Sequence, residues 1–252
     1  MVDEVNIKEI GLSIFPTFGV KVDGLSIENR KGPGFSERPL LHLDEFVLDV
    51  KLLPLLANRF EVNQLVFHKP SILLEVNKDG EENFSDAQKE EGKEQEREKG
   101  LTVRAGGGGS LLLSNFEIKD GEFEYVNMKE NRALRMKGLD MCLRVETIAE
   151  VNEMRTESEV KIARFSYGTR EKPLIDSLPL SLKQKSKIIV EENTLTLEQG
   201  DLDIQGLKFR MVGALTVVDE KPSFVDFTVN SENLDLEQIL SLLPRGLLKE
   251  TE

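Results

Sequence analysis

Residues 115–125 read Asn-Phe-Glu-Ile-Lys-Asp-Gly-Glu-Phe-Glu-Tyr, and this stretch decides the class of fold. Apolar residues alternate with charged ones on both sides of Asp120-Gly121, which is the period that a β-strand gives to its two faces. An Asp-Gly pair between two alternating runs is a strong signal for a tight hairpin turn. The stretch therefore predicts two short antiparallel strands, each with one apolar face and one polar face.

The same alternation continues along most of the chain, and it predicts roughly fifteen short strands with frequent turn signals. Further turns are expected at Asp23-Gly24, Lys137-Gly138, Gln199-Gly200 and Gln205-Gly206. Pro70 is expected at a strand's first residue or at a break between strands. Because no helical pattern of 10–15 residues alternates with the strands, a parallel βαβ sheet is disfavoured. We therefore predict a mainly β fold, a long antiparallel meander with a few short helices.

The chain of 252 residues is predicted to form one domain in two strand blocks, residues 1–85 and 111–252. Residues 86–110 between them form a linker, with a charged run at Asp86–Lys99 and a glycine run at Gly106–Ser110. A short helical turn is expected at residues 52–58. A second short helix is expected near the end, where Leu236, Ile239, Leu240 and Leu243 follow helical spacing.

Composition excludes several kinds of partner. The net charge of −13 and the lack of a basic stripe argue against nucleic acid, and attraction to anionic lipid headgroups is not expected either. Lys183, Lys185 and Lys187 alternate as the solvated face of one strand would. The sequence contains no run of 18 apolar residues, so we expect no membrane-spanning helix within it. The acidic start of the chain is typical of the interior of a longer protein.

A search for catalytic and metal-binding patterns finds none. His42 and His68 lack metal-ligand spacing and are expected on strand surfaces. Cys142 is expected as a small buried side chain, and Asp201 and Asp203 lack the surrounding pattern of a calcium loop. We therefore predict no catalytic residue, no metal, no cofactor and no enzymatic activity.

A meander of this length with one apolar face has two outcomes. It folds over to bury that face against itself, as in a sandwich, or it curls into a half-open groove with an apolar interior. A groove would shield the acyl chains of a lipid from water, which needs no catalytic residue. The candidate groove residues are Val22, Ile27, Leu48, Phe67, Leu74, Ile118, Phe123, Phe209, Met211 and Phe227.

Several segments together resemble the AsmA family in their order and spacing. The opening segment 11–29 has the family's Phe-Pro, Gly and Asn pattern, and Pro70-Ser71-Ile72 with Gly80-x-x-Asn83 resembles the end of that block. Residues 115–125 resemble its paired strands, and segments 178–182 and 233–244 are also similar to the family. The similarity covers nearly the whole chain outside 86–110.

The resemblance implies a Gram-negative envelope protein on the periplasmic side of the inner membrane, held there by an N-terminal helix absent from this chain. The wider family, which includes TamB-like proteins, is associated with outer-membrane biogenesis and with carrying phospholipid along a β-groove. We therefore expect phospholipid or another lipid as the ligand, with envelope proteins as further partners. The alternative hypothesis is a scaffold module that binds a protein partner and buries its own apolar face.

Overall fold

The computed structural model describes residues 5–13, 18–51, 54, 60–84, 104–105, 109–148, 152–189, 191–218, 221–231 and 240. Within these residues, thirteen strands join in one sheet. They are β1 (Val5–Ser13), β2 (Phe18–Ile27), β3 (Leu41–Val50), β4 (Phe60–His68), β5 (Ser71–Val76), β6 (Arg104–Ala105), β7 (Gly109–Asn127), β8 (Arg132–Ile148), β9 (Glu153–Gly168), β10 (Pro173–Ile189), β11 (Thr194–Ile204), β12 (Leu207–Val218) and β13 (Lys221–Asn230).

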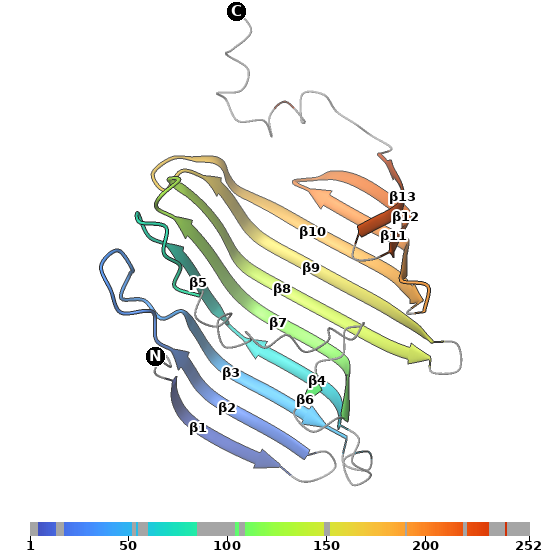
Figure 1. Cartoon of the computed structure of the whole chain (residues 1–252), viewed down its shortest axis with the longest axis horizontal. Helices are drawn as coiled ribbons and strands as arrows, with labels where there is room; N and C mark the ends of the chain where they lie inside the picture. Colours follow the sequence, from blue (N-terminus) through green and yellow to red (C-terminus); the bar gives the residue numbers. More distant parts are fainter. Residues whose placement is uncertain are drawn as a thin grey trace, which may run out of the picture.

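The strands follow the order β1-β2-β3-β4-β7-β8-β9-β10-β11-β12-β13, and β5 pairs with both β3 and β7 (Figure 1). Neighbours are antiparallel, as predicted, except that β7 runs parallel to β4 and β5. Parallel neighbours need a long connection, and residues 77–108 supply one here. Pro70 lies between β4 and β5, which confirms the predicted break. Both short strands therefore lie end to end along the long strand β7.

Most of the predicted glycine turns are wrong. Asp120-Gly121, Lys137-Gly138, Asp23-Gly24 and Gln199-Gly200 all lie inside continuous strands, and only Gln205-Gly206 connects two strands. A two-residue hairpin turn of type I′ requires a positive φ at both central residues. Gln205 and Gly206 both have one, at 52° and 91°, whereas in the Asp120-Gly121 pair only Asp120 does. A single such residue kinks a strand without reversing it.

The apolar positions of β1, β2, β3, β4, β7, β8 and β9 switch parity along one line across the sheet, which we call the crease, and four residues on it have a positive φ: Gly24, Lys69, Asp120 and Gly138. It consists of the consecutive pairs Lys8-Glu9, Asp23-Gly24, Asp44-Glu45, His68-Lys69, Lys119-Asp120, Lys137-Gly138 and Ala163-Arg164 on neighbouring strands. Within each strand the apolar positions change parity at this line, for example from Phe116 and Ile118 to Phe123 and Tyr125.

The parity change keeps most of the apolar side chains on one face of the sheet, whereas the buried Val66, Leu73, Val126 and Ala133 lie on the other face with Glu117, Glu124 and Glu75. A Cβ placed on Gly121 would lie 2.9 Å from Cγ2 of Ile118, so these two positions face the same side although three residues separate them. Two consecutive residues of each strand, such as Lys119 and Asp120, therefore point to the polar face. Bulged positions of this kind bend a strand and increase its twist, and β7–β10 bend along their length in Figure 1.

The sheet is a single curled layer, with β11–β13 turned away from the plane of β1–β10 (Figure 1). Few apolar side chains are fully buried, and most lie in β3, β4, β5, β7 and β8: they are Leu43, Val50, Val62, Val66, Leu73, Val76, Val126, Ala133 and Leu207. A sandwich would bury a whole face of each sheet. Of the two predicted outcomes, the described residues form the curled groove.

Other predictions have mixed outcomes. Residues 86–103 and 106–108 of the predicted linker lie outside the described residues, whereas Arg104–Ala105 and Gly109–Ser110 belong to strands. Both expected helices also lie outside them, apart from Pro54 and Leu240, each with helical backbone. In the part of the chain that is described, no helix is long and apolar enough to cross a bilayer.

Candidate functional site

A continuous row of apolar side chains crosses ten strands, on the side of the crease where Ile118 and Met141 lie. We call it the apolar row: Ile10, Val22, Phe46, Phe67, Ile118, Met141, Val160, Leu182, Leu202 and Phe209. Each member is the direct register partner of the next, so its side chain lies on the same face of the sheet. With strands spaced about 4.8 Å apart, nine spacings give the row a contour length of about 43 Å.

Aromatic rings reinforce the row where β3, β4 and β7 meet. The ring centres of Phe46 and Phe67 lie 5.4 Å apart, and those of Phe67 and Phe116 lie 5.7 Å apart in an edge-on arrangement. Such pairs contribute about 0.5–1.5 kcal/mol each beyond the area that they bury. The ring contacts therefore stabilise the packing of β3, β4 and β7 against one another, although no second layer covers this face.

The apolar row is packed along the sheet but not covered. None of its ten members is fully buried, and Ile10 at the β1 edge is 57% exposed. The β13 edge is similar, because Phe227 and Val229 there are 47% and 59% exposed. A face with this many partly exposed apolar side chains is unusual for a water-soluble surface, and it is therefore the candidate binding surface.

All ten predicted groove residues lie on this face. Val22, Phe67, Ile118 and Phe209 are members of the apolar row. Leu48 and Met211 belong to the adjoining row, and Phe227, which pairs with Gly213, lies one row further out. Ile27, Leu74 and Phe123 lie beyond the crease, on the same side as Ile118. Placement on one face does not test their role, so lipid contact by these residues stays a prediction.

Sequence reasoning missed other members of the row. Phe46, Met141 and Val160 have the right alternation, but only the register shows that they continue the line from Phe67 and Ile118. Strand β1 was not predicted. Its signal was present, since Ile7 and Ile10 are separated by two consecutive charged residues, the same switch that marks the crease in other strands.

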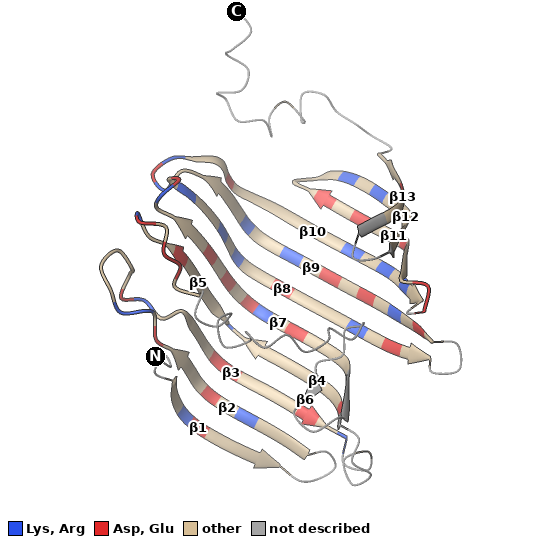
Figure 2. Cartoon of the chain, viewed as in Figure 1, with Lys and Arg blue, Asp and Glu red and all other residues tan. Residues whose placement is uncertain are grey.

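Charged residues recur along the strands (Figure 2), and the register places those of β8, β9 and β10 on the face opposite the apolar row, where they form a ladder of alternating charges. The prediction that the three alternating lysines of β10 form a solvated face is confirmed, and each pairs with a glutamate of β9. The Nζ to carboxylate distances are 3.4 Å for Lys183–Glu159, 2.8 Å for Lys185–Glu157 and 2.9 Å for Lys187–Glu153. The pairs of Lys183 and Lys185 are exposed and contribute little singly, whereas Glu153 is buried at 7% exposure between Lys187 and Arg155.

The ladder also changes acidities. Hydrogen bonding to Lys185 lowers the pKa of Glu157, and the same contact raises the pKa of Lys185. Hydrogen bonding to Lys161 lowers the pKa of Glu159.

Cys142 lies on this polar face between Glu117 and Glu159 and is only half-buried, so its prediction as a buried side chain is wrong. In β8 the apolar residues after Gly138 are Leu139, Met141 and Leu143, which all point to the apolar face. Cys142 lies between two of them in the strand, so its side chain points to the polar face.

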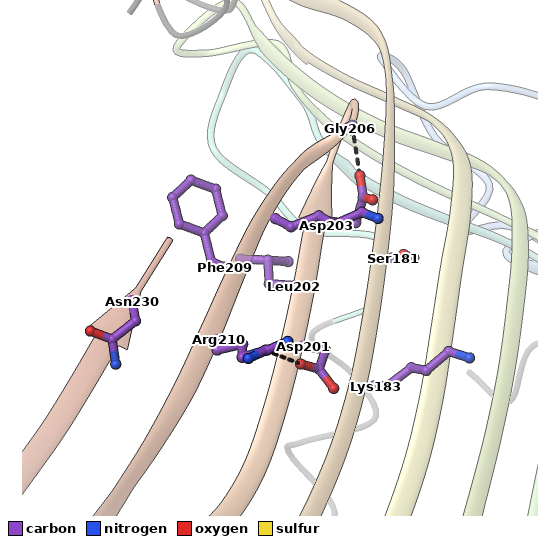
Figure 3. A pocket seen from close by; sticks show the side chains of 10 residues that line it. Ser181, Lys183, Asp201, Leu202, Asp203, Gly206, Phe209, Arg210 and Asn230 are labelled. Atoms are coloured by element: carbon purple, nitrogen blue, oxygen red, sulfur yellow. Dashed lines mark hydrogen bonds and ion pairs between the residues drawn. The ribbon is translucent and has the colours of Figure 1, made fainter. Parts of the chain in front are cut away.

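A hollow of about 770 Å³ lies over β10–β13 (Figure 3). Seven of its lining residues belong to polar-face rows: Ser181, Lys183, Asp201, Asp203, Lys208, Arg210 and Asn230. Arg210 Nε lies 3.9 Å from Asp201 Oδ1, and Asp203 Oδ1 accepts a hydrogen bond from Gly206 N at 2.7 Å. Because opposite charges alternate around it, the hollow has no strong field of one sign for a charged ligand.

Metal binding finds no support among the described residues, where no three His, Cys, Asp or Glu side chains converge. His42 Nε2 lies 3.6 Å from Asp44, and His68 Nε2 lies 3.5 Å from Glu45. Both histidines lie on strand surfaces beside single carboxylates, as predicted. Each histidine therefore has one carboxylate beside it, which is too few ligands for a metal site.

A buried polar cluster fastens the loop after β2 to β5. The Glu75 side chain is 3% exposed, and its Oε2 accepts hydrogen bonds from Asn29 Nδ2 at 2.8 Å and from Ser36 N and Oγ, both at 3.0 Å. Asn83 Nδ2 donates to Asn29 Oδ1 at 2.9 Å, and Asn83 Oδ1 accepts from Glu75 N at 2.7 Å. Asn29 and Asn83 both carry the family resemblance, and the fold brings them into contact.

A single curled sheet with an uncovered apolar row on one face and a charged ladder on the other defines a groove-forming β protein. The AsmA family pattern matches residues 4–171, which is 168 of the 252 residues. The chain belongs to the AsmA family, a family associated with the bacterial envelope, and this membership is consistent with a role in envelope biogenesis. No curated protein and no solved structure matches the chain.

Proposed function

We propose that the apolar face of the sheet binds the acyl chains of lipids, phospholipid above all, and that it conducts them between the inner and outer membranes. The place of action is the periplasmic side of the inner membrane of a Gram-negative bacterium, with an N-terminal helix as the anchor. The observation that carries this proposal is the apolar row, which crosses ten strands without a polar member and is left uncovered.

The energetics favour such a surface for this task. Taking a diacyl lipid with about thirty methylenes through water costs on the order of 24 kcal/mol, at about 0.8 kcal/mol per methylene. Continuous contact along the row offsets much of this cost. The contour of about 43 Å exceeds the roughly 30 Å hydrocarbon core of one bilayer. Passage between two membranes would therefore need further copies of the chain or partner proteins. Binding of acyl chains by this surface needs no catalytic residue.

The first test is the lipid content of the purified protein. Protein extracted without detergent exchange should carry phospholipid, measured by mass spectrometry. Phe123→Lys and Phe209→Glu should lower the bound lipid several-fold, because each places a charge among apolar side chains. The matched controls are Glu122→Lys and Lys208→Glu, which change the neighbouring residue on the polar face. Absence of lipid in the native protein, or equal loss in the controls, contradicts the proposal.

A second candidate function is a scaffold in outer-membrane biogenesis that binds a protein partner. The observation in its favour is the exposure of apolar side chains on both edge strands, such as Leu12 at 68% and Val225 at 61%. Photocrosslinking in cells from the apolar face distinguishes the two functions. Lipid adducts support transport, whereas protein adducts without lipid adducts support the scaffold.

A further inference from the structure

Strand β1 has an open edge. It pairs with β2 on one side, and no described residue pairs with its other side. Its four apolar side chains are largely exposed: Val5 at 51%, Ile7 at 47%, Ile10 at 57% and Leu12 at 68%. An open edge offers its backbone groups to another strand, and the charges on this edge, Lys8 and Glu9, have opposite signs, so they oppose a neighbouring strand only where its charges fail to match them. This edge is therefore a place where a further strand fits.

The sequence of β1 is complementary to itself when two copies run antiparallel. One alignment places Val5 opposite Leu12 of the partner copy and Ile7 opposite Ile10 of the partner copy, so apolar residues meet apolar ones. The same alignment places Lys8 opposite Glu9 of the partner copy, and symmetry makes this ion pair occur twice. A shift by one residue would instead set Ile10 against a lysine or an asparagine.

The crease makes this alignment possible. In a regular strand Ile7 and Ile10 would face opposite sides, but here both have apolar partners on the same face, Leu25 and Val22 in β2. Between them Lys8 and Glu9 are exposed, and neither has an ion-pair partner among the described residues. Strands β2 and β3 match their crease pairs in this way, since Asp23-Gly24 lies opposite Asp44-Glu45. Two copies of β1 can do the same.

The other open edge fits β1 less well. Strand β13 has exposed apolar side chains at Val225, Phe227 and Val229, which alternate without a switch of parity. If β13 paired with β1, its apolar residues would lie opposite apolar residues of β1 on one side of the crease. On the other side of the crease they would lie opposite polar residues. A second β1 matches both sides of the crease, so the sequence of the two edges favours a symmetric pair over a head-to-tail chain.

We propose that two copies of this chain pair through the outer edge of β1 in the antiparallel register just described. The pairing sets the apolar side chains of the two copies side by side, so that the two apolar faces become one surface. The Lys8–Glu9 pairs on the polar face fix the register. This inference rests on the edge and its sequence, and it does not depend on which ligand the apolar face binds.

A charge exchange tests this pairing. Sedimentation velocity of the full chain over a concentration series should show a monomer–dimer equilibrium. Lys8→Glu and Glu9→Lys each replace two attractive pairs by two repulsive ones and should each raise the dissociation constant roughly tenfold or more. The double variant Lys8→Glu/Glu9→Lys recreates both pairs in reverse and should restore dimerisation.

The controls make the outcome decisive. Phe227→Asp changes the β13 edge and should leave the dimer intact, and circular dichroism should show the same strand content in every variant. A monomer at all concentrations overturns the proposal. A dimer that ignores the single charge changes, or that the double variant fails to restore, overturns it equally.

Discussion

Gly138 is the crease residue at which we expect a side chain to destabilise the fold most. Its φ is +62°, and a Cβ placed there would lie 2.8 Å from the Cβ of Ala163 on β9. A side chain in the left-handed region costs about 1–2 kcal/mol, and overpacking of this kind adds roughly 1–3 kcal/mol. Gly138→Ala should therefore lower the free energy of unfolding by about 2–5 kcal/mol in total.

Urea unfolding followed by circular dichroism measures this loss as a shift of the midpoint at unchanged slope. Gly11→Ala is the matched control, because it also lies in a strand and a Cβ there would have only ordinary contacts, 3.8 Å from Lys21 Cβ. It should be neutral or slightly stabilising, since alanine restricts the unfolded chain.

A second substitution separates the two costs at Gly138. Ala163→Gly removes the facing Cβ, so the double variant Gly138→Ala/Ala163→Gly should recover the contact part of the loss but not the backbone part. If Gly138→Ala is no more destabilising than Gly11→Ala, residue 138 does not adopt the kinked conformation and the crease is wrong.

Three further predictions concern packing and charge. Asn83→Ala should cost about 2 kcal/mol because it leaves buried partners unsatisfied, whereas the exposed Asn6→Ala should change the urea midpoint little. Leu43→Ala, in the small core, should cost about 3 kcal/mol, and Phe46→Ala about 1.5 kcal/mol because its ring is already partly exposed. The pKa of Glu157 is lowered in the folded state, so its contribution to stability is present above its unfolded pKa of about 4.3 and is lost as pH falls through the lower folded value. Urea midpoints measured from pH 7 to pH 3 should therefore decline below about pH 4.5, and a midpoint that rises on acidification contradicts this sign.

Local alternation predicted the apolar face and most of the residues in strands, but it missed β1 and divided long strands such as β7 and β8 into shorter ones. Phe67, Ile118 and Phe209 were selected from alternation alone, and the register places them in one row. Period-two patterning predicts which face a side chain takes within a strand, and packing then requires those faces to agree across neighbours. The family match over residues 4–171 confirms the resemblance drawn from Asn29, Asn83 and the strands between them.

Turns were harder to predict, because the same dipeptide serves two structures. Asp120-Gly121 and Gln205-Gly206 both supply residues that tolerate a positive φ, yet the first kinks a strand and the second reverses the chain. The difference lies in neighbouring strands, since β8 continues past Asp120 and pairs on both sides of it. The parallel pairing of β4 with β7 was also inaccessible, because it depends on contacts across the linker and not on local sequence.

Lipid contact by the apolar face can be tested residue by residue in β8. A photoreactive amino acid placed singly at positions 134–143 of the full chain, in membranes containing native phospholipid, reports which side chains touch acyl chains. Lipid adducts should form at Leu134 and Met136, then at Leu139, Met141 and Leu143, with the parity changing at Gly138. Adducts at every position, adducts that continue on even positions past Gly138, or no lipid adducts at all would contradict an acyl-binding face.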